Sequence, residues 1–156
     1  MRFKVSMKIT AKEFFDVFTD SLIQDCLALT GKVLHDKDIV DGLTYEKKVM
    51  KVNGKVRGMA KVTVVKATRY SYIAVNYKAD EVDRDVIMDI AETGAASIEV
   101  TCTETYCRTV KSIAWGGDAR QLEDLNTELV KTPNSKHRHF KMIEREALKK
   151  RKKATA

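Results

Sequence analysis

The fold is decided by residues 44–66, which read TYEKKVMKVNGKVRGMAKVTVVK. The dipeptide Asn53-Gly54 lies between two runs that are rich in β-branched and basic residues. This dipeptide favours a tight hairpin turn, because both turn positions require a positive φ. We therefore expect one strand at 44–52 and a second at 55–66, paired antiparallel.

Three further strands are expected on the C-terminal side of this hairpin, at 69–79, 84–92 and 97–107. Their sequences alternate apolar with polar residues or are rich in tyrosine and β-branched residues. Turn sequences separate them at 80–83 and at 93–94. Strands joined by tight turns, without helices between them, are antiparallel neighbours in one sheet.

A strand and a helix are expected on the N-terminal side. Residues 2–9 alternate strictly between polar and apolar side chains, which is typical of a half-buried strand. Thr10 and Glu13 then form the pattern of a capping box, followed by apolar residues at helical spacing. Gly31 stands where a left-handed residue would end the helix. The pattern predicts a helical segment over Ala11–Thr30, which Thr19-Asp20-Ser21 could bend or split into two shorter helices.

The C-terminal third is less regular. Residues 109–118 have no clear pattern, and Asp118 is suited to cap a short helix. That helix would carry Leu122, Leu125 and Leu129. Pro133 would end it, and we expect a second helix from Ser135 to about Lys152.

These elements predict an α+β fold. A sheet with a wide apolar face needs a cover, and the only long helices are near the two ends. We expect a curved antiparallel sheet of six or seven strands wrapped around a long C-terminal helix (a helix grip), with an N-terminal helical segment after the first strand. One domain would span residues 1–153, and residues 149–156 would form a basic, frayed tail.

The composition fits one folded domain: 156 residues, 44% hydrophobic and 33% charged. No apolar run is long enough to span a membrane. The N-terminal sequence lacks the apolar stretch of a signal peptide. Cys26, Cys102 and Cys107 contain no CxxC pair, and their odd number does not suit a disulfide framework. We expect reduced thiols and a cytoplasmic protein.

The net charge of +7 is confined to the C-terminal segment. From residue 136 onward there are nine Lys or Arg residues and two acids, Glu144 and Glu146. The remainder is balanced, so the chain has a neutral body and a basic end. The run Lys149–Lys153 could bind phosphates or anionic lipids. It has no aromatic stacking partners or recognition-helix motif, so we expect no specific nucleic-acid binding.

The order of elements resembles the START-like superfamily, also called SRPBCC, helix-grip or birch-allergen-like. The resemblance rests on the first strand, the helix after it, the meander of strands and the terminal helix. Residues 42–48 and 54–64 are similar to an uncharacterised bacterial family of unknown function within that superfamily. The resemblance implies roles as wide as lipid or hormone carriage, polyketide cyclisation and co-chaperone work. Fold alone does not choose among them.

The inward side chains of the sheet and the facing residues of the C-terminal helix are the candidate ligand-binding residues. Methionines and aromatic residues on such a face suit an adaptable apolar pocket. An ordinary filled core is the alternative. The candidates are Met59, Ile73, Val75, Tyr77, Met88, Ile98, Val100, Phe140 and Ile143.

No catalytic residue, metal site or cofactor is predicted. His137 and His139 would point about 200° apart on a helix, so they cannot share a metal. Asp80, Glu81, Asp83 and Asp85 gather near a turn but lack the spacing of a calcium loop. A solvated hairpin tip is the simpler interpretation.

Three hypotheses follow. The leading one is a protein that binds a small apolar or amphipathic ligand, lipids included, in a cavity between sheet and C-terminal helix. The second is a cyclase- or hydrolase-like enzyme, in which Tyr45, Tyr77 or Glu104 would have to point inward near one another. The third is an interaction protein that docks through its basic tail. The sequence leaves the oligomeric state open, a homodimer included.

Overall fold

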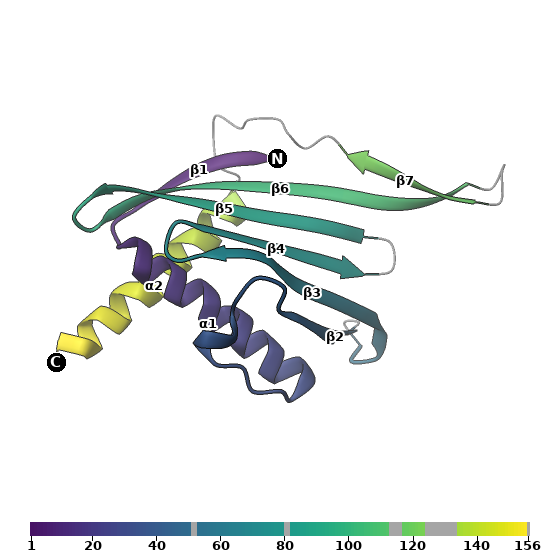
Figure 1. Cartoon of the computed structure of the whole chain (residues 1–156), viewed down its shortest axis with the longest axis horizontal. Helices are drawn as coiled ribbons and strands as arrows, with labels where there is room; N and C mark the ends of the chain where they lie inside the picture. The colour runs from purple at the N-terminus through teal and green to yellow at the C-terminus, as the bar shows by residue number, and fades with distance from the viewer. Residues whose placement is uncertain (51–52, 80–81, 113–116, 124–133, 156) are drawn as a thin grey trace.

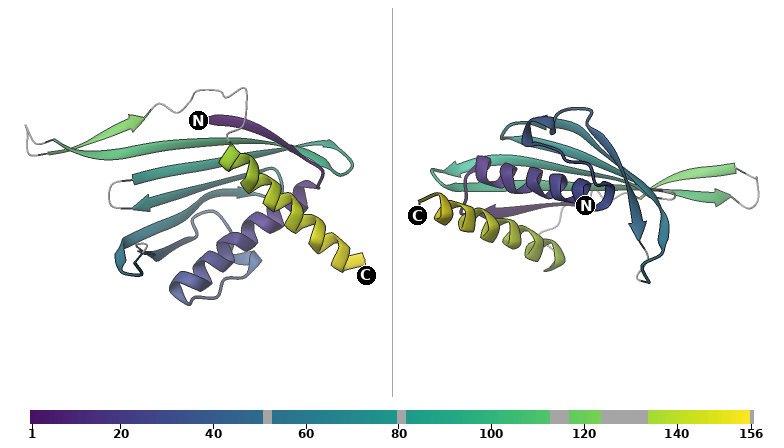
Figure 2. Two further views of the ribbon diagram at one scale, coloured as in Figure 1. Left: turned by 180° about the vertical axis from the view of Figure 1, so that it is seen from behind. Right: turned by 90° about the horizontal axis from the view of Figure 1, so that it is seen from below.

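The computed structural model describes residues 1–50, 53–79, 82–112, 117–123 and 134–155. It shows a curved antiparallel sheet with helices crossing one another beside it (Figures 1 and 2). The sheet order is β1-β6-β5-β4-β3-β2, and β7 also pairs with β6. The elements are β1 (Arg2–Met7), α1 (Ala11–Thr30), the 3-10 helix η1 (Asp36–Asp38), β2 (Thr44–Met50), β3 (Val56–Thr68), β4 (Tyr72–Ala79), β5 (Val82–Gly94), β6 (Ser97–Ser112), β7 (Gly117–Glu123) and α2 (Asn134–Thr155). The α+β class and the plan of a curved sheet with a helix after the first strand and a C-terminal helix are confirmed.

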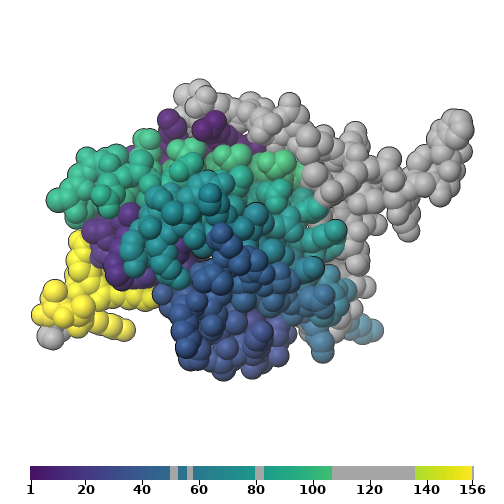
Figure 3. All heavy atoms as spheres, viewed as in Figure 1, coloured from purple at the N-terminus to yellow at the C-terminus, as the bar shows by residue number. Residues whose placement is uncertain are grey.

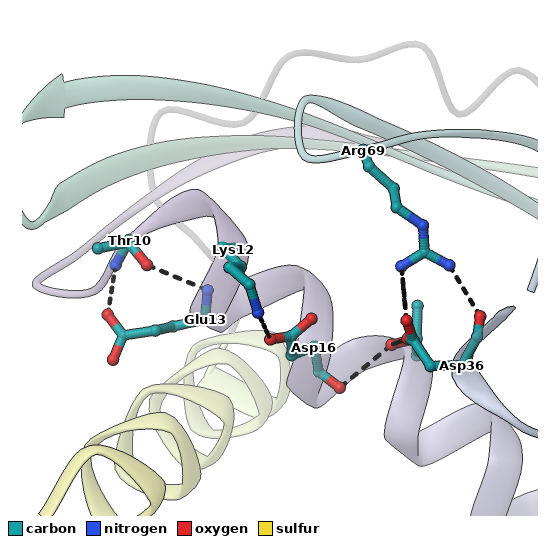
Figure 4. A network of polar contacts seen from close by, with 7 residues as sticks. Thr10, Lys12, Glu13, Asp16, Asp36 and Arg69 are labelled. Atoms are coloured by element: carbon teal, nitrogen blue, oxygen red, sulfur yellow. Dashed lines mark hydrogen bonds and ion pairs between the residues drawn. The ribbon is translucent and has the colours of Figure 1, made fainter. Parts of the chain in front are cut away.

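Helix α1 begins and ends as the sequence indicates. The Glu13 amide donates to Thr10 Oγ1 at 3.1 Å, and the Thr10 amide donates to Glu13 Oε1 at 2.9 Å, which completes the capping box (Figure 4). Gly31 has a φ of 72°, and its amide donates to the Leu27 carbonyl at 3.0 Å. These local bonds satisfy backbone groups that a helix end otherwise leaves unpaired.

Asp36, in the segment after α1, forms side-chain hydrogen bonds with two other parts of the protein. Its carboxylate accepts hydrogen bonds from Thr19 of α1 at 3.2 Å and from Arg69 at 3.1 Å (Figure 4). Arg69 lies in the connection between β3 and β4. Asp36 therefore joins the helix to the sheet through side chains that are far apart in the sequence.

The core lies between the inward face of the sheet and the two helices. Side chains of β1 alternate exposed and buried, as the period of two predicts. Phe140 of α2 contacts both Phe3 of β1 and Phe14 of α1, with ring centroids 5.9 and 6.2 Å apart respectively. One aromatic cluster thus joins both helices to the sheet.

Strands β2 and β3 pair antiparallel as expected, and residues 51–52 of the predicted hairpin lie outside the described residues. Met50 is opposite Val56, and Gly54 between them has a φ of 80°. The register of β3 against β4 shifts between Val64 and Lys66. Such bulges bend a strand and increase the local twist.

Two predictions for this region are wrong: the helix starting at Asp118 and the irregular segment starting at residue 109. Strand β6 continues to Ser112, and Gly117–Glu123 form β7, which pairs with residues 106–112 of β6. Strand β1 pairs with the same edge of β6 along residues 98–103, and Met1 exchanges backbone hydrogen bonds with Glu104. β7 therefore supplies hydrogen bonds to a stretch of β6 that β1 does not reach. Leu125, Leu129 and Pro133 lie outside the described residues.

Helix α2 includes the basic run Lys149–Lys153 and packs across α1 (Figure 2). The last turns of α2, in yellow, lie next to the start of α1 in Figure 3. There Arg151 donates to both carboxylate oxygens of Glu13, at 2.8 and 2.5 Å, and Lys150 lies 3.6 Å from Asp20. Neither helix has a stretch apolar enough to cross a membrane, within the residues described.

Candidate ligand pocket between the sheet and helix α2

A pocket of about 370 Å³ lies between the inward face of the sheet and helix α2, and it is partly open to solvent. Strands β4, β5 and β6 form one wall, while α1 and α2 supply the other. Its apolar lining consists of Phe18, Val86, Met88, Cys102 and Phe140. Its polar lining consists of Ser21, Tyr77, Arg84, Glu104, Lys136 and His139.

The structure brings three of the nine predicted residues to this pocket: Tyr77, Met88 and Phe140. Ile143 lines a second, smaller depression between α1 and α2. Four others are packed into the core: Ile73, Val75, Ile98 and Val100. Met59 is 47% exposed and lies in neither pocket. Much of the predicted lining is thus filled core, and the pocket occupies only one part of the sheet face.

Glu104 is a buried charge in the wall of this pocket. The residue is 4% exposed, and it follows Val100 and Cys102 on the inward face of β6. Lys136 Nζ, from the first turn of α2, donates to Glu104 Oε1 at 2.5 Å. Glu104 Oε2 is also buried but has no hydrogen-bond partner among the described residues. A buried carboxylate oxygen without a donor is unfavourable, so the pocket wall holds an acceptor that the described residues leave unsatisfied.

A second polar group comes from Arg84 of β5. Its guanidinium carbon lies 4.6 Å from the centre of the Tyr77 ring and 6.0 Å from that of Tyr106. Arg84 is opposite Tyr77 in the sheet, and Glu104 is opposite Val86, two residues from Arg84. Arg84 and Glu104 are therefore diagonal neighbours on the inward face. Burial raises the pKa of Tyr77 above its ordinary value of 10, so its hydroxyl stays protonated at neutral pH.

Two further ionisable groups in the lining stay neutral. Burial, and then the Glu104 charge, raise the pKa of the Cys102 thiol to about 12, so this thiol is no nucleophile at neutral pH. Burial and the Lys136 charge lower the pKa of His139 below 6.5, so its imidazole is neutral at pH 7. The charged groups of the pocket are therefore Arg84, Lys136 and Glu104.

Of the three residues that the enzyme hypothesis requires near one another, only two lie in the same pocket. Tyr77 and Glu104 share the pocket, but Tyr45 does not line it and donates its hydroxyl proton to Asp25 at 2.8 Å. Within the described ranges, no group of three or more His, Cys, Asp or Glu side chains could hold a metal ion. Of the acidic residues near residue 80, Asp83 and Asp85 lie in β5 and accept hydrogen bonds from Asn76. Asp80 and Glu81 lie outside the described residues.

Sequence patterns did not predict three polar residues of the lining: Arg84, Lys136 and His139. The sequence did contain a signal for Arg84. It lies two residues before Val86 and four before Met88, so all three side chains are on the same face of the strand. A charge at an inward position of an otherwise apolar strand face indicates a polar site. No comparable signal existed for Lys136, because its contact with Glu104 joins residues that are 32 positions apart.

The comparisons with known proteins identify the family. Residues 1–112 match the family described as "Domain of unknown function (DUF3284)". The chain belongs to this family. Its matched region contains the sheet wall of the pocket, with Arg84 and Glu104, and ends before α2. A search of curated proteins finds no match.

Several solved structures show a weak likeness to this DUF3284 protein. A conserved protein from Geobacillus kaustophilus has a TM-score of 0.49 at 15% identity, over 94% of this chain and 93% of its own. A protein from Deinococcus radiodurans has a TM-score of 0.44 at 18% identity, over 68% and 81%. An uncharacterised protein from Rhizobium leguminosarum has a TM-score of 0.46 at 10% identity, over 95% and 90%. We base no inference on likenesses of this size.

Proposed function

We propose that this protein binds a small amphipathic ligand in the pocket between β4–β6 and α2. The observation that carries the proposal is Glu104 Oε2, a buried acceptor in the pocket wall that no described residue satisfies. A ligand that donates to this oxygen would remove the unfavourable burial. We include in the proposal that the chain is a START-like domain over residues 1–153 and acts in the cytosol, in keeping with the unpaired thiols of Cys26 and Cys102.

The distribution of the lining supports an amphipathic rather than a purely apolar ligand. Phe18, Met88 and Phe140 offer contacts to an apolar body, whereas Arg84, Glu104 and Lys136 offer polar contacts to a head group. Ligand pockets commonly combine a mainly apolar wall with a few polar groups that fix orientation. A volume of about 370 Å³ is within the range of small-molecule sites.

The proposal is tested by thermal unfolding of the whole chain in the presence of a panel of small amphipathic compounds. A compound that binds the folded protein raises the midpoint, and it does so more at higher concentration. Ser21 is exposed and lies at the pocket, so we expect Ser21→Trp to obstruct it with little effect on the fold. Met59→Trp, at an exposed position outside the pocket, is the matched control.

We expect the concentration-dependent shift in the wild type and in Met59→Trp, and its loss in Ser21→Trp. Circular dichroism of the three proteins without ligand checks that each is folded. If no compound shifts the wild type, or if Ser21→Trp responds as the wild type does, the pocket is not the binding site.

A further inference from the structure

The polar end of the pocket presents an acceptor beside two donors. Glu104 Oε2 is the acceptor, and an ionised carboxylate can only accept hydrogen bonds. Lys136 Nζ contacts the other oxygen of the same carboxylate, and Arg84 is the diagonal neighbour of Glu104 on the sheet. Ammonium and guanidinium groups can only donate. Whatever occupies this end therefore meets both kinds of partner at once.

Charge separates the classes of head group that could fit. An ammonium group would suit Glu104 but would lie close to two cations, Lys136 and Arg84. A carboxylate would suit those cations but would leave Oε2 without a donor and add a second anion next to it. A methyl or methyl ether group supplies no proton to Oε2. A hydroxyl is neutral, donates one hydrogen bond and accepts others, so it alone of these satisfies both sides.

We infer that the pocket selects a neutral hydroxyl group, an alcohol or a phenol, which donates its proton in a hydrogen bond to Glu104 Oε2. The inference rests on the proposed function and specifies the chemistry of its ligand. The apolar body of the ligand would lie against Met88 and Phe140, and the hydroxyl oxygen would accept from Lys136 or Arg84. Cys102 and His139, both neutral at pH 7, add no competing charge.

The test is isothermal titration of the whole chain at pH 7 with four compounds that share one apolar body. They are 4-butylphenol, 4-butylanisole, 4-butylbenzylammonium and 4-butylbenzoate. We expect the phenol to bind tightest, and to exceed the methyl ether by about tenfold or more, because a hydrogen bond to a charged group is at stake. This comparison is made in the wild-type protein and does not depend on any variant folding.

Two matched variants locate the effect. Glu104→Gln replaces the buried carboxylate with an amide, so the preference for phenol over methyl ether should fall to about threefold or less. Glu99→Gln makes the same change on the opposite face of β6, next to the inward Ile98 and Val100, and should keep the wild-type preference. An equal loss in both variants would overturn the role of Glu104.

The outcomes separate this inference from the proposed function. If phenol and methyl ether bind the wild type equally well, or if the ammonium or the carboxylate compound binds tightest, the hydroxyl preference is wrong and the ligand pocket stands. If none of the four compounds binds and the wider panel also gives no shift, the proposed function itself fails, and this inference with it.

Discussion

Two carboxylates show how differently single residues of the same type are used in this protein. Glu104 is buried in the pocket wall with one oxygen bonded to Lys136 and the other without a described partner. Glu13 is satisfied on every side, because it caps α1 through Thr10 and accepts two hydrogen bonds from Arg151. A fully bonded carboxylate contributes to stability, whereas a buried carboxylate oxygen without a donor is unfavourable.

Glu13 gives a prediction about acid stability. The Arg151 guanidinium, with further help from Thr10, lowers the pKa of Glu13 from 4.5 to about 2 in the folded state. A lowered folded-state pKa means that the unfolded chain takes up the proton first, so the stabilisation is complete above about pH 4.5 and is lost as the pH falls towards 2. We expect Arg151→Gln to be less stable than the wild type at pH 7 and to approach it near pH 3. Urea unfolding at both pH values measures the difference; a gap that does not narrow at low pH contradicts the assignment.

At the scale of elements, sequence patterns predict the ends of a helix correctly when the hydrogen bonds that cap it join residues close together in the sequence. Thr10, Glu13 and Gly31 lie within a few residues of the groups that they cap, and the structure confirms all three. The seventh strand was mistaken for a helix because Asp118 and Leu122 fit either interpretation. What makes this segment a strand is the edge of β6 beyond the reach of β1, and no local pattern encodes that.

Gly31 gives a prediction at this scale. Its φ of 72° is unfavourable for residues with a side chain, yet a Cβ at this position would have nothing within 4 Å. Gly31→Ala therefore creates backbone strain but no side-chain clash. It should lower the free energy of unfolding by about 1 kcal/mol. Gly31→Asn should cost less, because asparagine tolerates the left-handed region better. Urea unfolding of the two variants measures both values. Equal stability of Gly31→Ala and wild type would show that the left-handed cap is not maintained.

At the scale of the whole molecule, α2 serves both the core and the pocket. Its Phe140 lies against Phe3 and Phe14 in the core and also lines the pocket, while Lys136 one turn earlier reaches Glu104. The position of the helix on the sheet is thus fixed by an apolar cluster and by an ion pair close to it. A change that loosens α2 is expected to affect the stability of the fold and the shape of the pocket together.

Phe140 supplies the prediction at this scale. It is 1% exposed, and Phe140→Ala leaves a cavity among three elements that are distant in sequence, at a cost of about 3–5 kcal/mol. The exposed His137, on the same helix, is the control, and His137→Ala should change the stability by less than about 0.5 kcal/mol. Urea unfolding followed by circular dichroism compares them. A small loss for Phe140→Ala would mean that α2 is not held to the sheet by this cluster.

The sequence by itself determined the α+β class, the strand–helix start, the long meander and the C-terminal helix. These follow from the period of side-chain burial and from caps and turns, which act over a few residues. It also placed Tyr77, Met88 and Phe140 at a shared face. Only the tertiary structure decided that Ile73, Val75, Ile98 and Val100 fill the core, that Met59 is exposed, and that Lys136 meets Glu104 beside Arg84. The curvature of the sheet and the crossing of the two helices set those contacts. Both depend on packing between residues far apart in the chain, which the spacing of residues along one strand or helix does not specify.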